Sequence, residues 1–189
     1  PSDGRLTGDD SGPGRLPDPE EIVSIALGVL SEQDLLGQDI VITAGGTREF
    51  LDPVRFLGNS SSGKQGVALA VSARNRGAKV TLICANVSVP LPVGVTIVNV
   101  ITGGDMLSQV LKSASTADVI VMAAAVADYK PKIKQTSKMK KSADGSVPSI
   151  ELERTVDILA DLVIHRGTSH PDQVIVGFAA ETGDDKGSV

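Results

Sequence analysis

The sequence predicts an α/β protein built on a doubly wound, mainly parallel, Rossmann-like sheet that follows an N-terminal helical linker. Short runs rich in Val and Ile alternate with segments of helical period between residues 39 and 179, which is the order of elements in such sheets. Several of these runs are apolar throughout, as is typical of parallel strands that helices cover on both faces. Ligands bind beyond the carboxyl ends of the strands in this fold class, so the loops after the strands are the candidate site.

Residues 1–17 are rich in Gly, Asp and Pro, which are turn residues, and we predict that they form a linker. A helix is predicted to begin after Asp18, because Pro19 suits a first turn and the acids that follow it favour the helix dipole. Its apolar residues recur at helical spacing: Ile22, Ile25, Ala26, Val29 and Leu30. The globular domain is predicted to begin near Gly37, so residues 1–36 stand apart from it.

The remaining elements follow in order along the chain. Apolar runs predict strands at residues 39–44, 79–85, 95–101, 118–126 and 173–179, and the segment SIELE at residues 149–153 is expected as a further short strand. Amphipathic segments predict helices at residues 63–76, 104–115 and 156–165. Gly77 is expected to end the first of these helices. The fourth strand is the most hydrophobic, and the last strand is also predicted to be buried.

Composition excludes several classes of function. Hydrophobic residues make up 41% of the chain, and no apolar run approaches the roughly 20 residues that cross a bilayer. Cys84 is the only cysteine, which excludes an internal disulfide and fits a reducing cytoplasm. The net charge of −5 disfavours nucleic-acid binding, which needs a broad basic face. We therefore predict a cytoplasmic protein with neither a membrane nor a nucleic-acid partner.

Glycines and serines after the first core strand suggest a site for an anion. These residues are Gly45, Gly46, Ser60, Ser61, Ser62, Gly63 and Gly66. The later ones lie where a helix is expected to begin, and free backbone N–H groups and the helix dipole attract phosphate there. The alternative is an ordinary serine cap followed by a flexible glycine. Asn59, just ahead of the serines, is either a turn residue or a polar group that reaches a substrate.

A nicotinamide cofactor is disfavoured at three places. The compact GxGxxG motif is absent after the first strand, and the second strand ends at Asn86 without the acid that binds an NAD ribose. A short-chain dehydrogenase would also have Lys four residues after Tyr129, where this sequence has Ile133. An NAD(P)-binding oxidoreductase is therefore kept only as an alternative, together with a non-catalytic nucleotide-binding module.

A cluster of lysines follows the most hydrophobic strand: Lys130, Lys132, Lys134, Lys138, Lys140 and Lys141. Such a run is either a solvated surface or a cationic flap that closes over a triphosphate and neutralises it. Asp128, at the end of the same strand, is either a loop cap or a group that binds a nucleotide or metal.

Four segments together resemble the phosphopantothenate–cysteine ligase family: ITAGGTREFLDPVRFLGNSSSG, AAAVADYKP, KMKK and VGFAAET. They occur in the family's order over residues 39–183. The resemblance implies a CTP-dependent ligase of coenzyme A biosynthesis, which joins 4′-phosphopantothenate to L-cysteine through an acyl-cytidylate. It also implies Mg²⁺ as a cofactor and a homodimer of ligase domains.

The resemblance implies roles for individual residues. Asn59 and Lys138 match the catalytic residues that contact the acyl group and form the acyl-cytidylate. The nucleotide-binding positions are Gly45, Gly46, Ser61, Gly63, Gly66, Ala124, Ala125, Asp128, Lys138, Val156, Asp157, Ile158, Leu159 and Phe178. The phosphopantothenate contacts are Arg55, Asn59, Ala179 and Ala180, and Arg55 is expected to act from a neighbouring subunit. Val156 replaces the family's usual proline, and no metal ligand is assigned.

The N-terminal segment GDDSGPGRLPDPEEI resembles the end of a flavin-dependent phosphopantothenoylcysteine decarboxylase. Residues 1–36 are therefore expected to be a linker and helix from the end of such a domain. FMN would belong to the decarboxylase domain, and no flavin site is expected in this chain. Residues 37–189 are expected to be the nucleotide-binding ligase domain, without the C-terminal part with which the family continues after FAAET.

Overall fold

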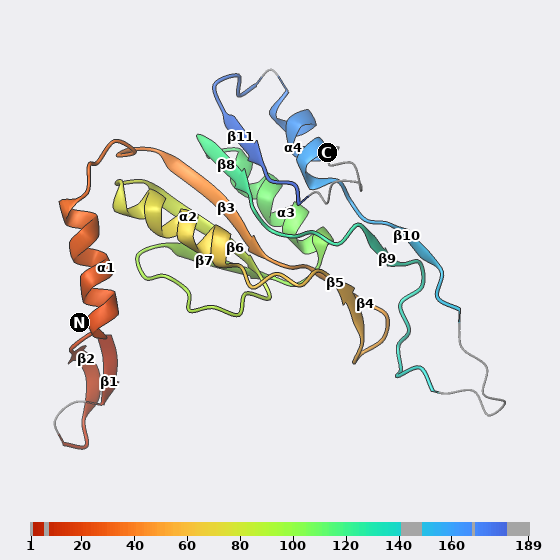
Figure 1. Cartoon of the computed structure of the whole chain (residues 1–189), viewed down its shortest axis with the longest axis horizontal. Helices are drawn as coiled ribbons and strands as arrows, with labels where there is room; N and C mark the ends of the chain where they lie inside the picture. The colour runs from red at the N-terminus through yellow and green to blue at the C-terminus, as the bar shows by residue number, and fades with distance from the viewer. Residues whose placement is uncertain (1, 6–7, 141–148, 168, 181–189) are drawn as a thin grey trace, which may run out of the picture.

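The computed structural model describes residues 2–5, 8–140, 149–167 and 169–180, and its centre is a five-stranded parallel sheet (Figure 1). The strands lie in the order β11-β8-β3-β6-β7. Their bounds are β3 Asp39–Gly45, β6 Lys79–Ala85, β7 Thr96–Val100, β8 Val119–Met122 and β11 Val174–Gly177. All four neighbouring pairs are parallel. Numbered along the chain, this is the 5-4-1-2-3 order of a Rossmann sheet, so the predicted fold class is confirmed.

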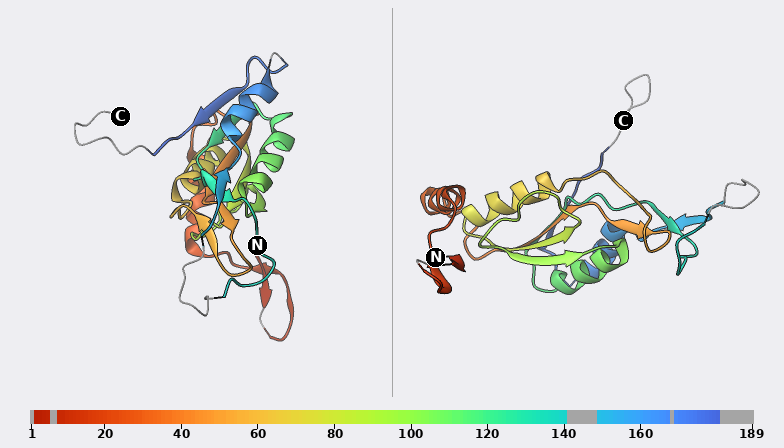
Figure 2. Two further views of the ribbon diagram at one scale, coloured as in Figure 1. Left: turned by 90° about the vertical axis from the view of Figure 1, so that its right-hand side faces the viewer. Right: turned by 90° about the horizontal axis from the view of Figure 1, so that it is seen from below.

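Helices cover both faces of the sheet, as a doubly wound fold requires (Figure 2). One face packs against α2 (Lys64–Asn75), whose Ala70 and Ala73 join a core with Leu82 of β6. The other face packs against α3 (Gly103–Ala114) and α4 (Ile158–Arg166). The second core includes Met106, Val110, Ile120 and Leu162, which are fully buried.

The N-terminal segment is only partly as predicted. The predicted helix is present as α1 (Pro19–Leu30), but none of its residues is buried, and it meets α2 through polar groups such as Ser24. The stretch predicted as a linker contains an antiparallel hairpin of β1 (Ser2–Arg5) and β2 (Ser11–Arg15). These strands were not predicted because they consist of glycine and polar residues with one proline, and no apolar alternation marks them.

Two short antiparallel strand pairs extend beyond the carboxyl ends of β3 and β8 and form a feature that we call the arm (Figure 1). It comprises β4 (Arg48–Phe50) with β5 (Phe56–Gly58), β9 (Tyr129–Pro131) with β10 (Leu152–Arg154), and the adjoining residues 51–55, 132–140 and 149–151. The sequence analysis missed β4, β5 and β9. It expected β10 at residues 149–153, whereas the strand begins three residues later.

Two core strands also differ from the prediction. Strand β8 ends at Met122 rather than at residue 126, because the chain after it turns to bond the loop that follows β3. Strand β11 was predicted to be buried but exposes Val174 and Val176, since it is the edge strand of the described sheet. None of the helices in the described residues is long and apolar enough to cross a membrane.

Candidate functional site

The loops that follow β3 and β8 lie side by side at the point where the strand order reverses. Gly46 and Ala125 form a parallel bridge there. The Ala125 amide donates to the Gly45 carbonyl at 2.8 Å, and the Thr47 amide donates to the Ala125 carbonyl at 3.1 Å. Gly45 has φ +88°, and a Cβ at this position would lie 2.0 Å from the Ala85 carbonyl oxygen. The positive φ and the close approach of this turn to the end of β6 therefore require glycine at position 45.

Two buried threonines hold the loop that follows β8. The Thr43 hydroxyl accepts a hydrogen bond from the Ala124 amide at 3.0 Å, and the Thr47 hydroxyl accepts one from the Ala127 amide at 2.9 Å. Both threonines are 0% exposed. The sequence analysis did not predict this role. The sequence signal for this role was a threonine inside an otherwise apolar strand, Thr43, and a second threonine shortly after that strand, Thr47.

The same loop is held from two further directions. Asn59, a predicted catalytic residue, donates from Nδ2 to the Val126 carbonyl at 3.0 Å. Thr155, just after β10, donates its amide to the Asp128 carbonyl at 2.9 Å and its hydroxyl to the Ala127 carbonyl. The backbone from residue 124 to residue 128 is thus a rigid floor for whatever binds above it.

A cleft of about 930 Å³ opens over this floor. It brings together many of the residues predicted from the sequence: Asn59, Ala124, Ala125, Asp128, Val156, Asp157, Ile158, Leu159, Phe178, Ala179 and Ala180. Ser60, which the sequence analysis placed in the anion site, lines the cleft as well, together with residues that were not predicted: Met122, Val126, Ala127, Tyr129, Arg154, Thr155 and Gly177. The cleft is therefore bounded by the ends of β8 and β11, the start of α4 and one end of the arm.

The start of α4 gives one end of the cleft its polarity. Asp157 is the N-cap residue, and its side chain accepts a hydrogen bond from the Ala160 amide at 2.9 Å. This carboxylate offsets the positive end of the helix dipole, so hydrogen-bond donors are favoured here over a phosphate. Gly177 of β11 lies against α4, because a Cβ there would be 2.8 Å from the Leu159 side chain.

A second group of predicted residues lies outside the cleft lining, at the start of α2. Gly63 is the N-cap residue, with φ +83° and no side-chain cap bond, and Ser61 is half-buried. Gly66 is buried within α2, where a Cβ would lie 2.6 Å from the Ala44 Cβ, so the helix packs directly on β3. Residues 59–63 connect the two groups, since Asn59 and Ser60 line the cleft. The Lys64 amide donates to the Ser62 hydroxyl at 3.4 Å, but the N-cap residue itself gives no side-chain bond, so the first turn of α2 retains the character of an anion site.

The arm fixes the chain next to the predicted catalytic lysine. Asp52 is 0% exposed and accepts hydrogen bonds from the Arg55 guanidinium at 2.9 Å and the Met139 amide at 3.1 Å. Arg55 also donates to the Met139 carbonyl at 2.7 Å. Burial alone would raise the pKa of Asp52, but amide hydrogen bonds from Val54 and Met139 and the Arg55 guanidinium lower the pKa to about 2. Met139 is therefore anchored, while Lys138 beside it is exposed and outside the cleft lining.

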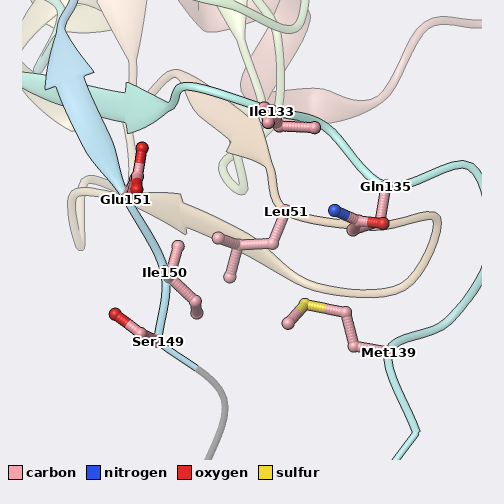
Figure 3. Close-up of a pocket in the computed structure, with 7 residues that line it drawn as sticks. All are labelled: Leu51, Ile133, Gln135, Met139, Ser149, Ile150 and Glu151. Carbon is pink, nitrogen blue, oxygen red and sulfur yellow. The ribbon is translucent and has the colours of Figure 1, made fainter.

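A smaller pocket of about 240 Å³ lies within the arm (Figure 3). Figure 3 shows the side chains of Leu51, Ile150 and Met139 converging on it. The amide of Gln135 donates to the Leu51 carbonyl at 2.9 Å and holds the segment after β9 against β4. The arm therefore holds a small, partly apolar pocket that is open to solvent, since Ile133 is 69% and Ile150 42% exposed.

The described residues contain no group of three or more His, Cys, Asp or Glu side chains arranged to hold a metal ion. Asp128 and Asp157 are nevertheless both in the cleft. Mg²⁺ is commonly bound by one or two carboxylates together with substrate phosphates and water, so this pair is compatible with a metal that arrives with a nucleotide.

The family of the chain follows from comparison with known proteins. The family model of the DNA/pantothenate metabolism flavoprotein C-terminal domain matches residues 35–188. The chain belongs to this family. The coenzyme A biosynthesis bifunctional protein CoaBC of Mycobacterium tuberculosis is 50% identical over 199 residues, which cover 100% of this chain and 47% of that protein. CoaBC of Bacillus subtilis is 45% identical over 188 residues, which cover 97% of this chain and 45% of that protein.

The chain spans about half the length of these curated relatives. Among solved structures, the crystal structure of the C-terminal domain of a CoaBC protein matches with a TM-score of 0.66 and 42% identity, over 82% of this chain and 70% of that one. A Cab2 mutant in complex with phosphopantothenate-cysteine matches with a TM-score of 0.62, over 89% of this chain and 74% of that one. At 17% identity, that second likeness shows the fold alone. The family assignment and the fold therefore agree with the resemblance found in the sequence.

Proposed function

We propose that this chain is the nucleotide-binding part of a phosphopantothenate–cysteine ligase of coenzyme A biosynthesis. It would use CTP to join the carboxylate of 4′-phosphopantothenate to the amine of L-cysteine. The observation that carries the proposal is that one cleft, in a chain of this family, gathers Asn59 with most of the nucleotide-binding positions expected from the sequence. The relatives named CoaBC support the pathway.

The proposed reaction has two steps. A carboxylate oxygen of phosphopantothenate attacks the α-phosphorus of CTP, so that an acyl-cytidylate forms and pyrophosphate leaves. The cysteine amine then attacks the acyl carbon, and the amide forms as CMP leaves with the bonding electron pair. Both substrates of the first step are anions, so the site must supply fixed positive charge or hydrogen-bond donors.

The chain's own groups are arranged for this task. The uncapped N-terminus of α2 and the adjoining Ser61 would bind phosphate oxygens. The end of the cleft near Asp157 and Phe178 would take the base and ribose, whose amino and hydroxyl groups donate to the carboxylate. Asn59 lines the cleft and comes two residues before Ser61, so its amide is positioned to orient the acyl group.

Lys138 would act from the arm. Its neighbour Met139 is held by hydrogen bonds to Asp52 and Arg55 in this structure, so these bonds would open when the segment that carries Lys138 moves. Because Lys138 is not part of the cleft lining, we propose that residues 132–140 close over the bound triphosphate as a flap. Of the lysine cluster, Lys141 lies outside the described residues. When Mg²⁺ is bound with the nucleotide, it would neutralise phosphate charge, held by Asp128 together with phosphate oxygens and water.

We also propose that the protein acts as a homodimer through the arm, which exposes Val54, Phe56 and Ile133. Arg55 lies beside this surface and outside the cleft of its own chain, as expected if it serves a neighbouring subunit. Light scattering of the full chain would test this: a monomer at micromolar concentration would contradict it. The prediction of a cytoplasmic location stays a prediction.

The alternative of an NAD(P)-binding oxidoreductase finds little support in the geometry. Asn86 stands where an NAD-binding acid would follow β6, and its side chain already donates to the Gly46 carbonyl at 2.9 Å. A non-catalytic module would bind CTP without turnover. The deciding experiment incubates the full chain with CTP, 4′-phosphopantothenate and L-cysteine and measures pyrophosphate and amide. Stoichiometric release of both supports the ligase, whereas CTP binding without either product favours the module.

A further inference from the structure

The strand pair β9–β10 carries charged side chains on both of its faces. On one face, Lys130 pairs with its register partner Glu153 at 3.3 Å. Beside them, Lys132 pairs with Glu151 at 3.4 Å. Four charges on this face therefore neutralise one another. Because side chains alternate along a strand, Arg154 points to the opposite face from Glu153.

That opposite face forms a wall of the cleft. Arg154 and its register partner Tyr129 both line the cleft, although they come from segments 25 residues apart in the sequence. The position of Arg154 is fixed at its base, because the next residue, Thr155, donates to the Asp128 and Ala127 carbonyls of the cleft floor. The side chain thus starts from a rigid point at the edge of the site.

Arg154 is also the one basic side chain among the described residues that line the cleft. No carboxylate of the described part of the chain lies within 4 Å of its guanidinium. Of the two acids in the cleft, Asp157 is engaged by the start of α4. A cation that pairs with no carboxylate of the described residues, next to a cleft of about 930 Å³, is available to an anionic ligand.

We infer that Arg154 is a phosphate-binding residue of the cleft, an inference that rests on the proposed function. A guanidinium presents two parallel N–H donors that match two oxygens of one phosphate, which an ammonium does not. Two substrates of the proposed reaction carry this chemistry, the triphosphate of the nucleotide and the phosphomonoester of 4′-phosphopantothenate. The experiment below distinguishes binding of the triphosphate from binding of the phosphomonoester.

The test compares Arg154→Gln and Arg154→Lys with the wild-type full chain. Calorimetry measures the Kd for CTP, and steady-state kinetics measures the KM for 4′-phosphopantothenate. Loss of a charge-assisted bidentate contact weakens binding by about tenfold or more, so Arg154→Gln raises one of these constants by that factor. Arg154→Lys raises it less, because it keeps the charge but not the fork. Lys79→Gln is the control, because it removes one positive charge at the opposite end of the sheet.

A rise in the CTP Kd assigns Arg154 to the nucleotide, and a rise only in the KM assigns it to phosphopantothenate. If Arg154→Gln leaves both constants within about twofold of wild type, the inference is overturned while the proposed function stands. If the wild type binds CTP but makes no amide, the proposed function fails and the CTP measurement still decides the role of Arg154. If the wild type binds neither substrate, both are overturned.

Discussion

Replacing Thr47 with valine tests whether the floor of the cleft depends on a buried hydroxyl. The side chain is 0% exposed and its hydroxyl accepts the Ala127 amide at 2.9 Å, so Thr47→Val keeps the shape but leaves that amide without its acceptor. An unpaired buried N–H costs about 1–3 kcal/mol, and burial of the new methyl group returns at most about 0.8 kcal/mol. The net loss of about 1–2 kcal/mol lowers the Tm of a chain of this length by roughly 2–8 °C.

Thermal unfolding followed by circular dichroism measures this shift, and CTP titration of the same samples measures its effect on the cleft. We expect CTP binding to weaken together with the Tm, because Ala124 and Ala125 lie in the loop that Thr47 holds. The matched control is Thr81→Val on β6, whose hydroxyl bonds no other described residue and which therefore keeps both values. A Thr47→Val protein with the Tm and CTP affinity of the wild type would refute the role assigned to this hydroxyl.

Three substitutions and a change of pH test other parts of the molecule. Lys138→Gln should abolish acyl-cytidylate formation, whereas Asn59→Asp should let the intermediate form and slow amide release. Rapid-quench analysis measures the amount of this intermediate. A wild-type amount of acyl-cytidylate in the Lys138→Gln protein would contradict the prediction. Gly66→Ala would place its new Cβ 2.6 Å from that of Ala44, so urea unfolding should report a loss of about 1–3 kcal/mol, and an unchanged midpoint would show that α2 shifts freely. The pKa of Asp52 is lowered to about 2, so its contribution to stability is present above about pH 4 and is lost as the pH falls toward 2. The NMR shift of the Met139 amide, which donates to Asp52, should titrate with a midpoint near pH 2; a midpoint near pH 4 would show an ordinary carboxylate.

The sequence was sufficient to predict the central sheet because each core strand is an apolar run of its own. Strand β6 begins and ends where its pattern predicts, and helices α2 and α3 differ from prediction by only one residue at each end. The arm could not be predicted in this way. Its strands are three residues long, and they are stabilised by pairing between segments distant in the chain, such as β9 with β10. No local period marks such pairing.

Site residues could be predicted from the sequence where they belong to a recognisable motif. They could not be predicted where their role depends on which groups the fold brings next to them. Asn59 and Asp128 lie in motif segments and line the cleft. Thr43 and Thr47 lie in a motif too, but their role depends on which backbone amides the fold brings to them. Arg154 faces the cleft only because β10 pairs with β9 in one register, and a shift by one residue would turn Glu153 toward the cleft instead.

Hydrogen bonds between the loops after β3 and β8 explain why the open cleft of this chain does not lie where a Rossmann fold binds its dinucleotide. In that fold class a dinucleotide crosses the crevice where the strand order reverses, here between β3 and β8. In this chain hydrogen bonds span that crevice, from Thr47 to Ala125 and from Asn59 to Val126. The open volume lies instead toward β11 and the start of α4. Because a single cleft would have to hold both the nucleotide and the acyl substrate, the rigidity of the loop beneath them would set how closely the carboxylate approaches the α-phosphate.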